Sequence, residues 1–222
     1  MKLLHVFEAA LGYKFSRPEL LRQALTHRSF GTPHNERLEF LGDSLLNCVI
    51  AGALFLRFSE LKEGDLSRVR ASLVRQETLA EIALTLHLGD YLCLGDGEMK
   101  SSGFRRPSTL ADALEAVFAA IYLDAGFDAV RGVIEQLYQP FIAHIDPAHS
   151  GKDPKTTLQE LLQARRLPVP RYELLATHGE AHAQEFEVEC IIAALGIRRV
   201  GMGNSRRIAE QQAANLALSE IK

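Results

Sequence analysis

Three carboxylates stand close together in the stretch NERLEFLGDSLLN. If this stretch is an α-helix, Glu36, Glu39 and Asp43 fall within about 60° of arc on one face, and Asn47 lies one turn further along it. The opposite face and the following run VIAGALFLRF are apolar, which predicts that much of the helix is buried. Because buried carboxylates are costly unless they are paired or bind a cation, the simplest interpretation is a divalent metal ion.

A second acidic pair lies in the apolar stretch TLADALEAVFAAIYLDAG, where Asp112 and Glu115 are three residues apart and therefore share one helix face. If the two acidic helices pack together, this pair can meet Glu39 and Asp43 of the first helix. Four carboxylates around one pocket suit a hard cation with oxygen ligands, above all Mg²⁺. Such an ion can activate water and stabilise the leaving oxygen in phosphodiester cleavage.

Three alternatives to a magnesium site are open. A solvated acidic face explains an isolated acid well, but it explains four acids on two apolar helices less well. A di-iron carboxylate site needs Glu-x-x-His pairs, whereas the residue three after Glu39 is Gly42 and neither acidic face carries a histidine. Ser44 lacks the GxSxG turn of a serine nucleophile, and His27 and His34 fit capping or packing better than general-base catalysis.

The bulk composition allows one large or two small domains. The 222 residues are 47% hydrophobic with a formal net charge of −3, so nucleic-acid binding would have to depend on local patches. The three cysteines, Cys48, Cys93 and Cys190, are far apart in apolar contexts and are expected to be reduced core thiols. The N-terminus meets Glu8 before a long apolar run forms, and no run is expected to reach membrane-spanning length. We therefore expect a cytoplasmic protein without membrane contact.

The elements expected in residues 1–146 are all helical. The first helix has Leu4 and Leu11 on one face, and Ser16 is expected to cap a second helix with Pro18 in its first turn. Residues 91–108 are rich in Gly and Ser, which indicates a long surface loop. Further helices are expected over about residues 35–58, from a loop at 63–67 into the 70s, and over 76–86, 109–126 and 127–145.

The composition changes at IDPAHSGKDP, which is typical of a linker, here placed at residues 147–153. From Gly151 onward the chain carries ten Lys or Arg and nine Asp or Glu, so the acidic excess belongs to the first part. The apolar spacing of residues 154–222 predicts the order α-β-β-β-α. The elements are expected at Thr156–Arg165, Tyr172–Thr177, Glu185–Ile192, Gly196–Gly203 and Ser205–Ile221. The fold class is thus an all-α domain followed by a small α+β domain.

Arg206 and Arg207 stand in the first turn of the last helix, where cations oppose the helix dipole. This placement is favourable if an anion such as phosphate binds there, because bare N–H groups and two guanidinium groups then converge on it. The alternative is an exposed pair that only aids solubility. Gln159, Glu160 and His182 could bond sugar hydroxyls, and a glutamate suits the 2′-OH of RNA better than DNA.

These motifs resemble the signature of the ribonuclease III family. The likeness runs from NERLEFLGDSLLN through EGDLSRVRASLV, GEMKSSGFRRPSTLADALEAVFAAIYLD and KDPKTTLQELLQ to the end of the chain. It implies the bacterial domain order, with a catalytic domain at 1–146 and a double-stranded-RNA-binding domain at 154–222. The implied catalytic and metal-binding acids are Glu39, Asp43, Asp112 and Glu115, with Glu36, Glu63 and Asn47 as auxiliary residues of the cleavage centre. The implied RNA contacts are Gln159, Glu160, His182, Asn204, Ser205, Arg206 and Arg207.

The resemblance also implies an activity and an assembly. It implies a homodimer that cuts both strands of duplex RNA with Mg²⁺, or with Mn²⁺ in its place, and without an organic cofactor. The products would carry 5′-phosphate and 3′-hydroxyl ends with two-nucleotide 3′ overhangs, and the substrates would include ribosomal RNA precursors and messengers. The competing hypothesis is a protein that holds RNA duplexes without cutting them. The four acids argue against it, because a pure binder has no use for them.

Overall fold

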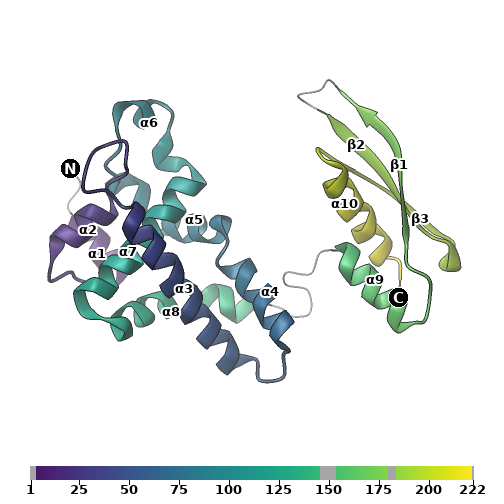
Figure 1. The fold of residues 1–222 in the computed structure, drawn as a ribbon, viewed down its shortest axis with the longest axis horizontal. Coiled ribbons are helices and arrows are strands. Elements are labelled where there is room, and N and C mark those ends of the chain that lie inside the picture. The colour runs from purple at the N-terminus through teal and green to yellow at the C-terminus, as the bar shows by residue number, and fades with distance from the viewer. Residues whose placement is uncertain (1–3, 146–153, 180–183, 222) are drawn as a thin grey trace. The chain divides into compact units, whose positions relative to one another are not determined.

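The computed structural model describes residues 4–145, 154–179 and 184–221. The chain forms two compact units, Met1–Gly151 and Lys152–Lys222 (Figure 1). The linker expected at residues 147–153 and the RNA contact expected at His182 lie outside the described residues.

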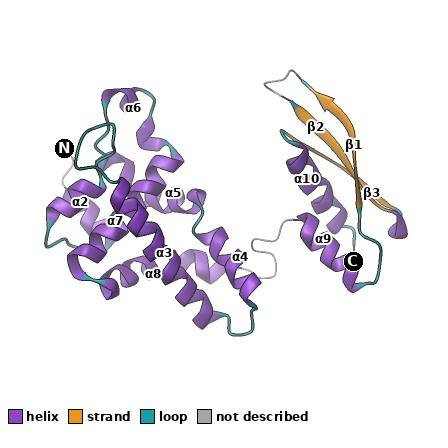
Figure 2. Cartoon of the chain, in the orientation of Figure 1, coloured by secondary structure: helices purple, strands orange, loops and turns teal. Residues whose placement is uncertain are grey.

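Helices make up the described secondary structure of the first unit, as predicted (Figure 2). Its long central helices are α3 (Glu36–Arg57) and α7 (Pro107–Ala125), which lie in the hydrophobic core. The other elements that contribute to this core are α1 (Leu4–Leu11), α2 (Pro18–Ala24), α4 (Glu63–Leu73), α5 (Gln76–Thr85), the 3-10 helix η1 (Leu88–Tyr91) and α8 (Phe127–His144). The short α6 (Asp96–Lys100) and the 3-10 helix η2 (Gly103–Arg105) lie between η1 and α7 in the chain.

The two acidic helices differ in burial. From Ala113 to Ile121, helix α7 buries every residue except Glu115. Helix α3 is less enclosed than the sequence predicts, because Phe40, Phe55 and Leu56 are 79%, 70% and 83% exposed. Among the described residues, α3 is long and apolar enough to span a membrane, but the core helices of soluble proteins meet the same two criteria. The expectation that no run reaches that length is therefore wrong on length and composition.

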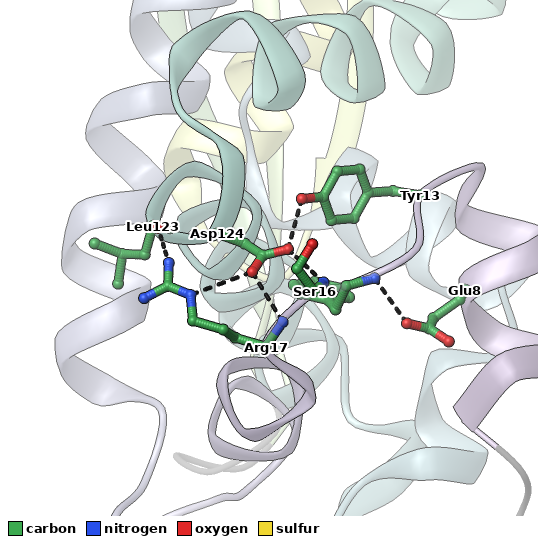
Figure 3. Close-up of polar contacts among 7 residues, drawn as sticks. Glu8, Tyr13, Ser16, Arg17, Leu123 and Asp124 are labelled. Carbon is green, nitrogen blue, oxygen red and sulfur yellow. Dashed lines mark hydrogen bonds and ion pairs between the residues drawn. The ribbon is translucent and has the colours of Figure 1, made fainter.

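The start of α2 is held by a residue far away in the sequence (Figure 3). The side chain of Asp124, near the end of α7, is fully buried and accepts hydrogen bonds from the backbone N–H groups of Ser16 and Arg17, at 2.9 and 3.0 Å, and from the Tyr13 hydroxyl at 2.7 Å. The Arg17 side chain also pairs with this carboxylate. The prediction that the Ser16 side chain caps α2 is thus wrong, because the N-cap residue is Arg17 and it makes no side-chain capping bond. The Asp124 carboxylate instead holds the two residues before the helix through their backbone N–H groups.

Two further expectations need correction. Residues 91–108 are not one continuous loop, because they contain α6 and η2, and the backbone N–H of His27 bonds the Cys93 carbonyl at 3.0 Å. All three cysteines are free, but only Cys190 is buried, whereas Cys93 is half-buried and Cys48 is exposed. Cys48 lies on the open side of α3, so it is not a core thiol.

The second unit has the predicted α-β-β-β-α order. A three-stranded antiparallel sheet runs β1 (Arg171–His178), β2 (Glu185–Ile192), β3 (Ile197–Gly203), with a bulge in β1 near Ala176 and the short 3-10 helix η3 (Ala193–Leu195) between β2 and β3. Helices α9 (Pro154–Ala164) and α10 (Arg206–Leu218) complete it. Its core joins the two helices to β2 and contains Leu158, Leu162, Cys190, Ile192, Ala213, Ala214 and Ala217.

Candidate metal centre and RNA-binding face

Three of the four predicted metal ligands come together in space. Carboxylate oxygens of Glu39, Asp112 and Glu115 lie within 4.8 Å of one another, and all three side chains are half-buried. Glu39 projects from α3 and the other two project from successive turns of α7. The group therefore forms where the two central helices pack against each other, as the spacing predicts.

The pKa values show how unfavourable this arrangement is without a counter-charge. Burial, followed by the negative charges of Asp43, Asp112 and Glu39, raises the pKa of Glu115 to about 8. Burial and then the charge on Asp112 raise the pKa of Glu39, and burial raises the pKa of Asp112 although His27 and Arg28 oppose it. Crowded oxygen donors that resist ionisation fit a divalent cation, because the ion supplies the missing positive charge.

Asp43 stands beside the cluster and not within the close group of three. It is exposed, and the Asn47 side-chain amide donates to its Oδ1 at 2.9 Å and to its backbone carbonyl at 3.0 Å. Its charge still acts on both neighbouring glutamates. Asn47 thus orients Asp43, which is a contact that the sequence spacing could indicate only as a shared helix face.

The predicted auxiliary acids occupy two different places. Glu36 is near the cluster, where its charge acts on Glu39 and Arg28 pairs with it at 3.0 Å. Glu63 begins α4 and lines an apolar pocket together with Ala51 and Phe55 of α3. Since Ala51 is twelve residues beyond Glu39, at about 1.5 Å per residue, Glu63 lies roughly 18 Å along the helix from the acid group.

A polar pocket of about 220 Å³ opens beside Glu39 and Asp112, and it brings in residues that the sequence analysis did not place there. Arg28 and Arg106 line it, and Arg106 pairs with Glu98 at 3.1 Å. Nothing in the sequence connected Arg106 or Arg28 with the acids. Cations beside an acidic metal centre suit the phosphate oxygens of a backbone substrate.

Burial of the neighbouring Tyr138 shows that the Glu115 side of the centre is enclosed by protein. Tyr138 of α8 is fully buried, and no described residue forms a hydrogen bond with its hydroxyl. Burial and then the charge on Glu115 raise the pKa of this hydroxyl. An ion at this place would be screened little by water on that side.

The second unit presents the described RNA contacts at the start of α10 and in the middle of α9. Ser205 caps α10, with its Oγ accepting from the Ile208 N–H at 3.3 Å, and the following Arg206 and Arg207 are exposed. Asn204 is exposed just before the cap, and Gln159 and Glu160 are exposed on α9. A capped helix start with two guanidinium groups is a suitable place for phosphate.

Comparison with known proteins agrees with this division. A family model described as Ribonuclease-III-like matches residues 17–141, and one described as a double-stranded RNA binding motif matches residues 154–221. The chain is 64% identical over 215 residues to Ribonuclease 3 of Aromatoleum aromaticum, covering 97% of this chain and 96% of that protein. It is 62% identical to Ribonuclease 3 of Thiobacillus denitrificans, covering 97% and 95%.

Solved structures resemble the first unit. The nuclease domain of ribonuclease III from Campylobacter jejuni matches with a TM-score of 0.63 and 43% identity, covering 66% of this chain and all of that one. A second structure of that domain, described by flexibility in a region involved in dimer formation, matches with a TM-score of 0.61 and 42% identity, covering 62% of this chain and 97% of that one.

A helical nuclease domain with clustered carboxylates, joined to a double-stranded-RNA-binding domain, defines a metal-dependent endonuclease that acts on duplex RNA. A family model covers more than half of the chain, and relatives above 60% identity cover nearly all of it. The chain belongs to the ribonuclease III family.

Proposed function

We propose that this protein cleaves double-stranded RNA with Mg²⁺ held by Glu39, Asp43, Asp112 and Glu115, and that Mn²⁺ can replace Mg²⁺. The supporting observation is the convergence of oxygens from Glu39, Asp112 and Glu115 within 4.8 Å on two otherwise apolar helices. An all-oxygen set of carboxylates suits these hard ions better than soft metals. When bound, the ion supplies a water nucleophile and charge neutralisation at the phosphate.

The residues of the chain contribute positioning and charge. Asn47 holds Asp43 through its Oδ1. Arg28 and Arg106 offer guanidinium groups to phosphate oxygens next to the scissile bond. Hydrolysis breaks the bond to the 3′-oxygen and leaves a 5′-phosphate and a 3′-hydroxyl.

We further propose a homodimer, in which two centres cut the two strands and leave two-nucleotide 3′ overhangs. The exposed Phe40 and Phe55 support it, since they lie on one side of α3 and large apolar side chains exposed on one side of a helix are typical of an interaction surface. The position of Glu63 also supports it. This acid lies about 18 Å from the acid group along α3, so in a dimer the α4 of the other chain is the source of the auxiliary acid for each cleavage centre. The related C. jejuni nuclease domain is described as having a region involved in dimer formation.

In the second unit, the proposal assigns duplex contacts to Gln159, Glu160, His182 and the helix start Asn204–Arg207. The capped start of α10 with its exposed arginines supports the phosphate contact. Recognition of this kind depends on duplex shape and 2′-hydroxyl groups more than on base sequence. The expected cellular roles are maturation of ribosomal RNA precursors and turnover of structured messengers in the cytoplasm.

The test is cleavage of an end-labelled RNA duplex by the wild type with Mg²⁺, with Mn²⁺ and with EDTA, and by the variants Asp43→Asn and Glu115→Gln with Mg²⁺. We expect cleavage with either metal, none in EDTA and a loss of at least 100-fold in both variants, while Glu115→Gln still binds the duplex. Glu135→Gln, an exposed glutamate of α8, is the matched control and should cleave normally. Cleavage that persists in EDTA, or in both variants, would refute the metal mechanism.

A further inference from the structure

The carboxylate of Glu210 lies between the two helix starts of the RNA-binding domain. Its Oε2 accepts a hydrogen bond from Lys155 Nζ at 2.6 Å, and its Oε1 accepts from Arg206 Nε at 3.1 Å. The Glu210 side chain is only 14% exposed, whereas that of Arg206 is 59% exposed. One acid thus uses both oxygens to join the first turn of α9 to the first turn of α10.

Lys155 is fixed from two further directions. Its ammonium group lies 4.5 Å from the centre of the Tyr172 ring, and its backbone N–H donates to the side chain of Gln211 at 3.1 Å. Because Lys155 is anchored in this way, Glu210 is a fixed point and not a freely moving surface acid. Burial favours a neutral Glu210, but the hydrogen bonds from Lys155 and Arg206 outweigh it and lower the pKa of this carboxyl.

The two helices that Glu210 joins carry the proposed RNA contacts. Arg206 belongs to the phosphate-binding start of α10, and Gln159 lies one turn beyond Lys155 on α9. A long arginine side chain loses rotamer freedom when it binds phosphate, and this cost falls if it is already held in place. The same bridge fixes the spacing between a phosphate contact and a sugar contact.

We propose that Glu210 is a positioning residue for duplex RNA, which holds Arg206 and Lys155 so that α9 and the start of α10 meet the RNA together. This inference rests on the proposed RNA face of α10. A simple charge argument predicts the opposite effect, since a negative group beside phosphate repels it. Replacement of Glu210 therefore separates the two explanations by the sign of the change in affinity.

The experiment measures duplex binding by the full chain in EDTA, over a series of salt concentrations, by fluorescence anisotropy. Glu210→Gln removes the charge, and Glu210→Asp keeps the charge but is one methylene too short to hold both partners. Glu220→Gln, which removes the same charge from an ion pair with Arg199, corrects for net charge. Arg206→Gln alone and combined with Glu210→Gln completes a double-mutant cycle.

We expect both Glu210 variants to bind about five- to tenfold more weakly than Glu220→Gln, with a shallower salt dependence. The Glu210→Gln effect should largely disappear when Arg206 is already replaced. Tighter or unchanged binding in Glu210→Gln, or an undiminished effect in the Arg206→Gln background, would overturn the inference. If circular dichroism shows that both Glu210 variants unfold the domain, Glu210 only stabilises the fold and the inference also fails.

The same data distinguish an error in the proposed RNA contacts of α10 from an error in the proposed role of Glu210. If the wild type does not bind the duplex, or if Arg206→Gln has no effect, the proposed face on α10 is wrong and the inference falls with it. If Arg206→Gln weakens binding while both Glu210 variants bind like Glu220→Gln, the face stands and the inference alone is wrong.

Discussion

Gly42 on α3 faces the backbone of Glu115 on α7 so closely that a Cβ at residue 42 would lie 3.0 Å from the Glu115 Cα and nearer still to its carbonyl group. Real Cβ atoms do not approach backbone in this way, so only glycine permits this crossing distance. Gly42 is adjacent to Asp43 in the chain, and its neighbour across the crossing is a member of the acid group. The separation of the two acidic pairs is therefore set by a residue without a side chain.

We predict that Gly42→Ala lowers the rate of duplex cleavage by about 100-fold, because a displacement of about 1 Å at a reacting centre has this effect. Overpacking should also lower the free energy of unfolding by about 1–3 kcal/mol. Gly132→Ala on α8, where an added Cβ meets nothing within 4 Å, should instead stabilise the protein by about 1 kcal/mol. Urea denaturation and a cleavage assay measure both, and normal cleavage by Gly42→Ala would contradict the prediction.

The buried Asp124 predicts a stability change far from the metal centre. Asp124→Ala leaves two N–H groups and the Tyr13 hydroxyl without their acceptor, which should lower the free energy of unfolding by about 1–3 kcal/mol. Asp128→Asn, whose carboxylate is 87% exposed and pairs with Arg131, should change it by less than about 0.5 kcal/mol. Equal effects in urea denaturation would show that the network in Figure 3 does not anchor α2.

Asp124 also contributes to acid sensitivity. Burial raises its pKa, but hydrogen bonds from Tyr13, Ser16 and Arg17 outweigh burial, so the folded pKa lies below the ordinary value of 3.8. Its stabilisation is present above about pH 4 and is lost as the pH falls through the folded pKa. An acid titration should therefore show a smaller loss of stability below about pH 4 in Asp124→Asn than in the wild type.

Near neutral pH the metal-free centre predicts that stability changes with pH in the opposite direction. The pKa of Glu115 is raised from 4.5 to about 8, so the folded state binds a proton that the unfolded state releases. The metal-free protein should lose stability as the pH rises from about 4.5 through about 8. Thermal unfolding in EDTA between about pH 6 and pH 8.5 measures this, and Glu115→Gln should flatten the slope.

Addition of Mg²⁺ should reverse this loss. Metal binding requires ionised carboxylates, so the increase in Tm on adding Mg²⁺ should be larger near pH 8 than near pH 6. The increase should be much smaller in Glu115→Gln at either pH. A Tm that responds to Mg²⁺ equally in the wild type and in Glu115→Gln would place the ion elsewhere.

Self-association should depend on the exposed side of α3 that carries Phe40. Phe40 is 79% exposed, and replacing it with a charged residue in Phe40→Asp should shift the protein from dimer toward monomer in analytical ultracentrifugation. Leu84→Asp on α5, where the leucine is 58% exposed, is the matched control and should leave the mass unchanged. A monomeric wild type, or a dimeric Phe40→Asp protein, would argue against an interface on this side.

The start of α10 predicts how RNA binding depends on salt. Replacing Arg206 and Arg207 together with glutamine should weaken binding to unrelated duplexes alike and reduce the slope of log affinity against log salt by about one to two. The control replaces Arg165 and Arg166 together with glutamine, which removes the same charge just beyond the last residue of α9. An unchanged slope after the double replacement would remove this helix start from the phosphate contacts.

Local spacing was sufficient for much of this architecture. The 3.6-residue period predicted α3 and α7, and alternation predicted three strands, because both patterns depend only on residues that are close together in the sequence. The same spacing placed Glu39 and Asp43 on one helix face and Asp112 and Glu115 on another. The sequence resemblance then supplied the nuclease and RNA-binding assignment that the family comparisons bear out.

Contacts between distant residues were decided only by the tertiary structure. The start of α2 is held by Asp124 and is not capped by Ser16, because a carboxylate more than a hundred residues away accepts from the backbone N–H groups of Ser16 and Arg17. The bridge from Glu210 to Lys155 likewise joins the first and last helices of the second unit, which are more than fifty residues apart in the sequence. The sequence determined which side chains share a helix face, whereas the close crossing at Gly42 decided that two such faces form one acidic centre, because that distance depends on the packing of whole helices.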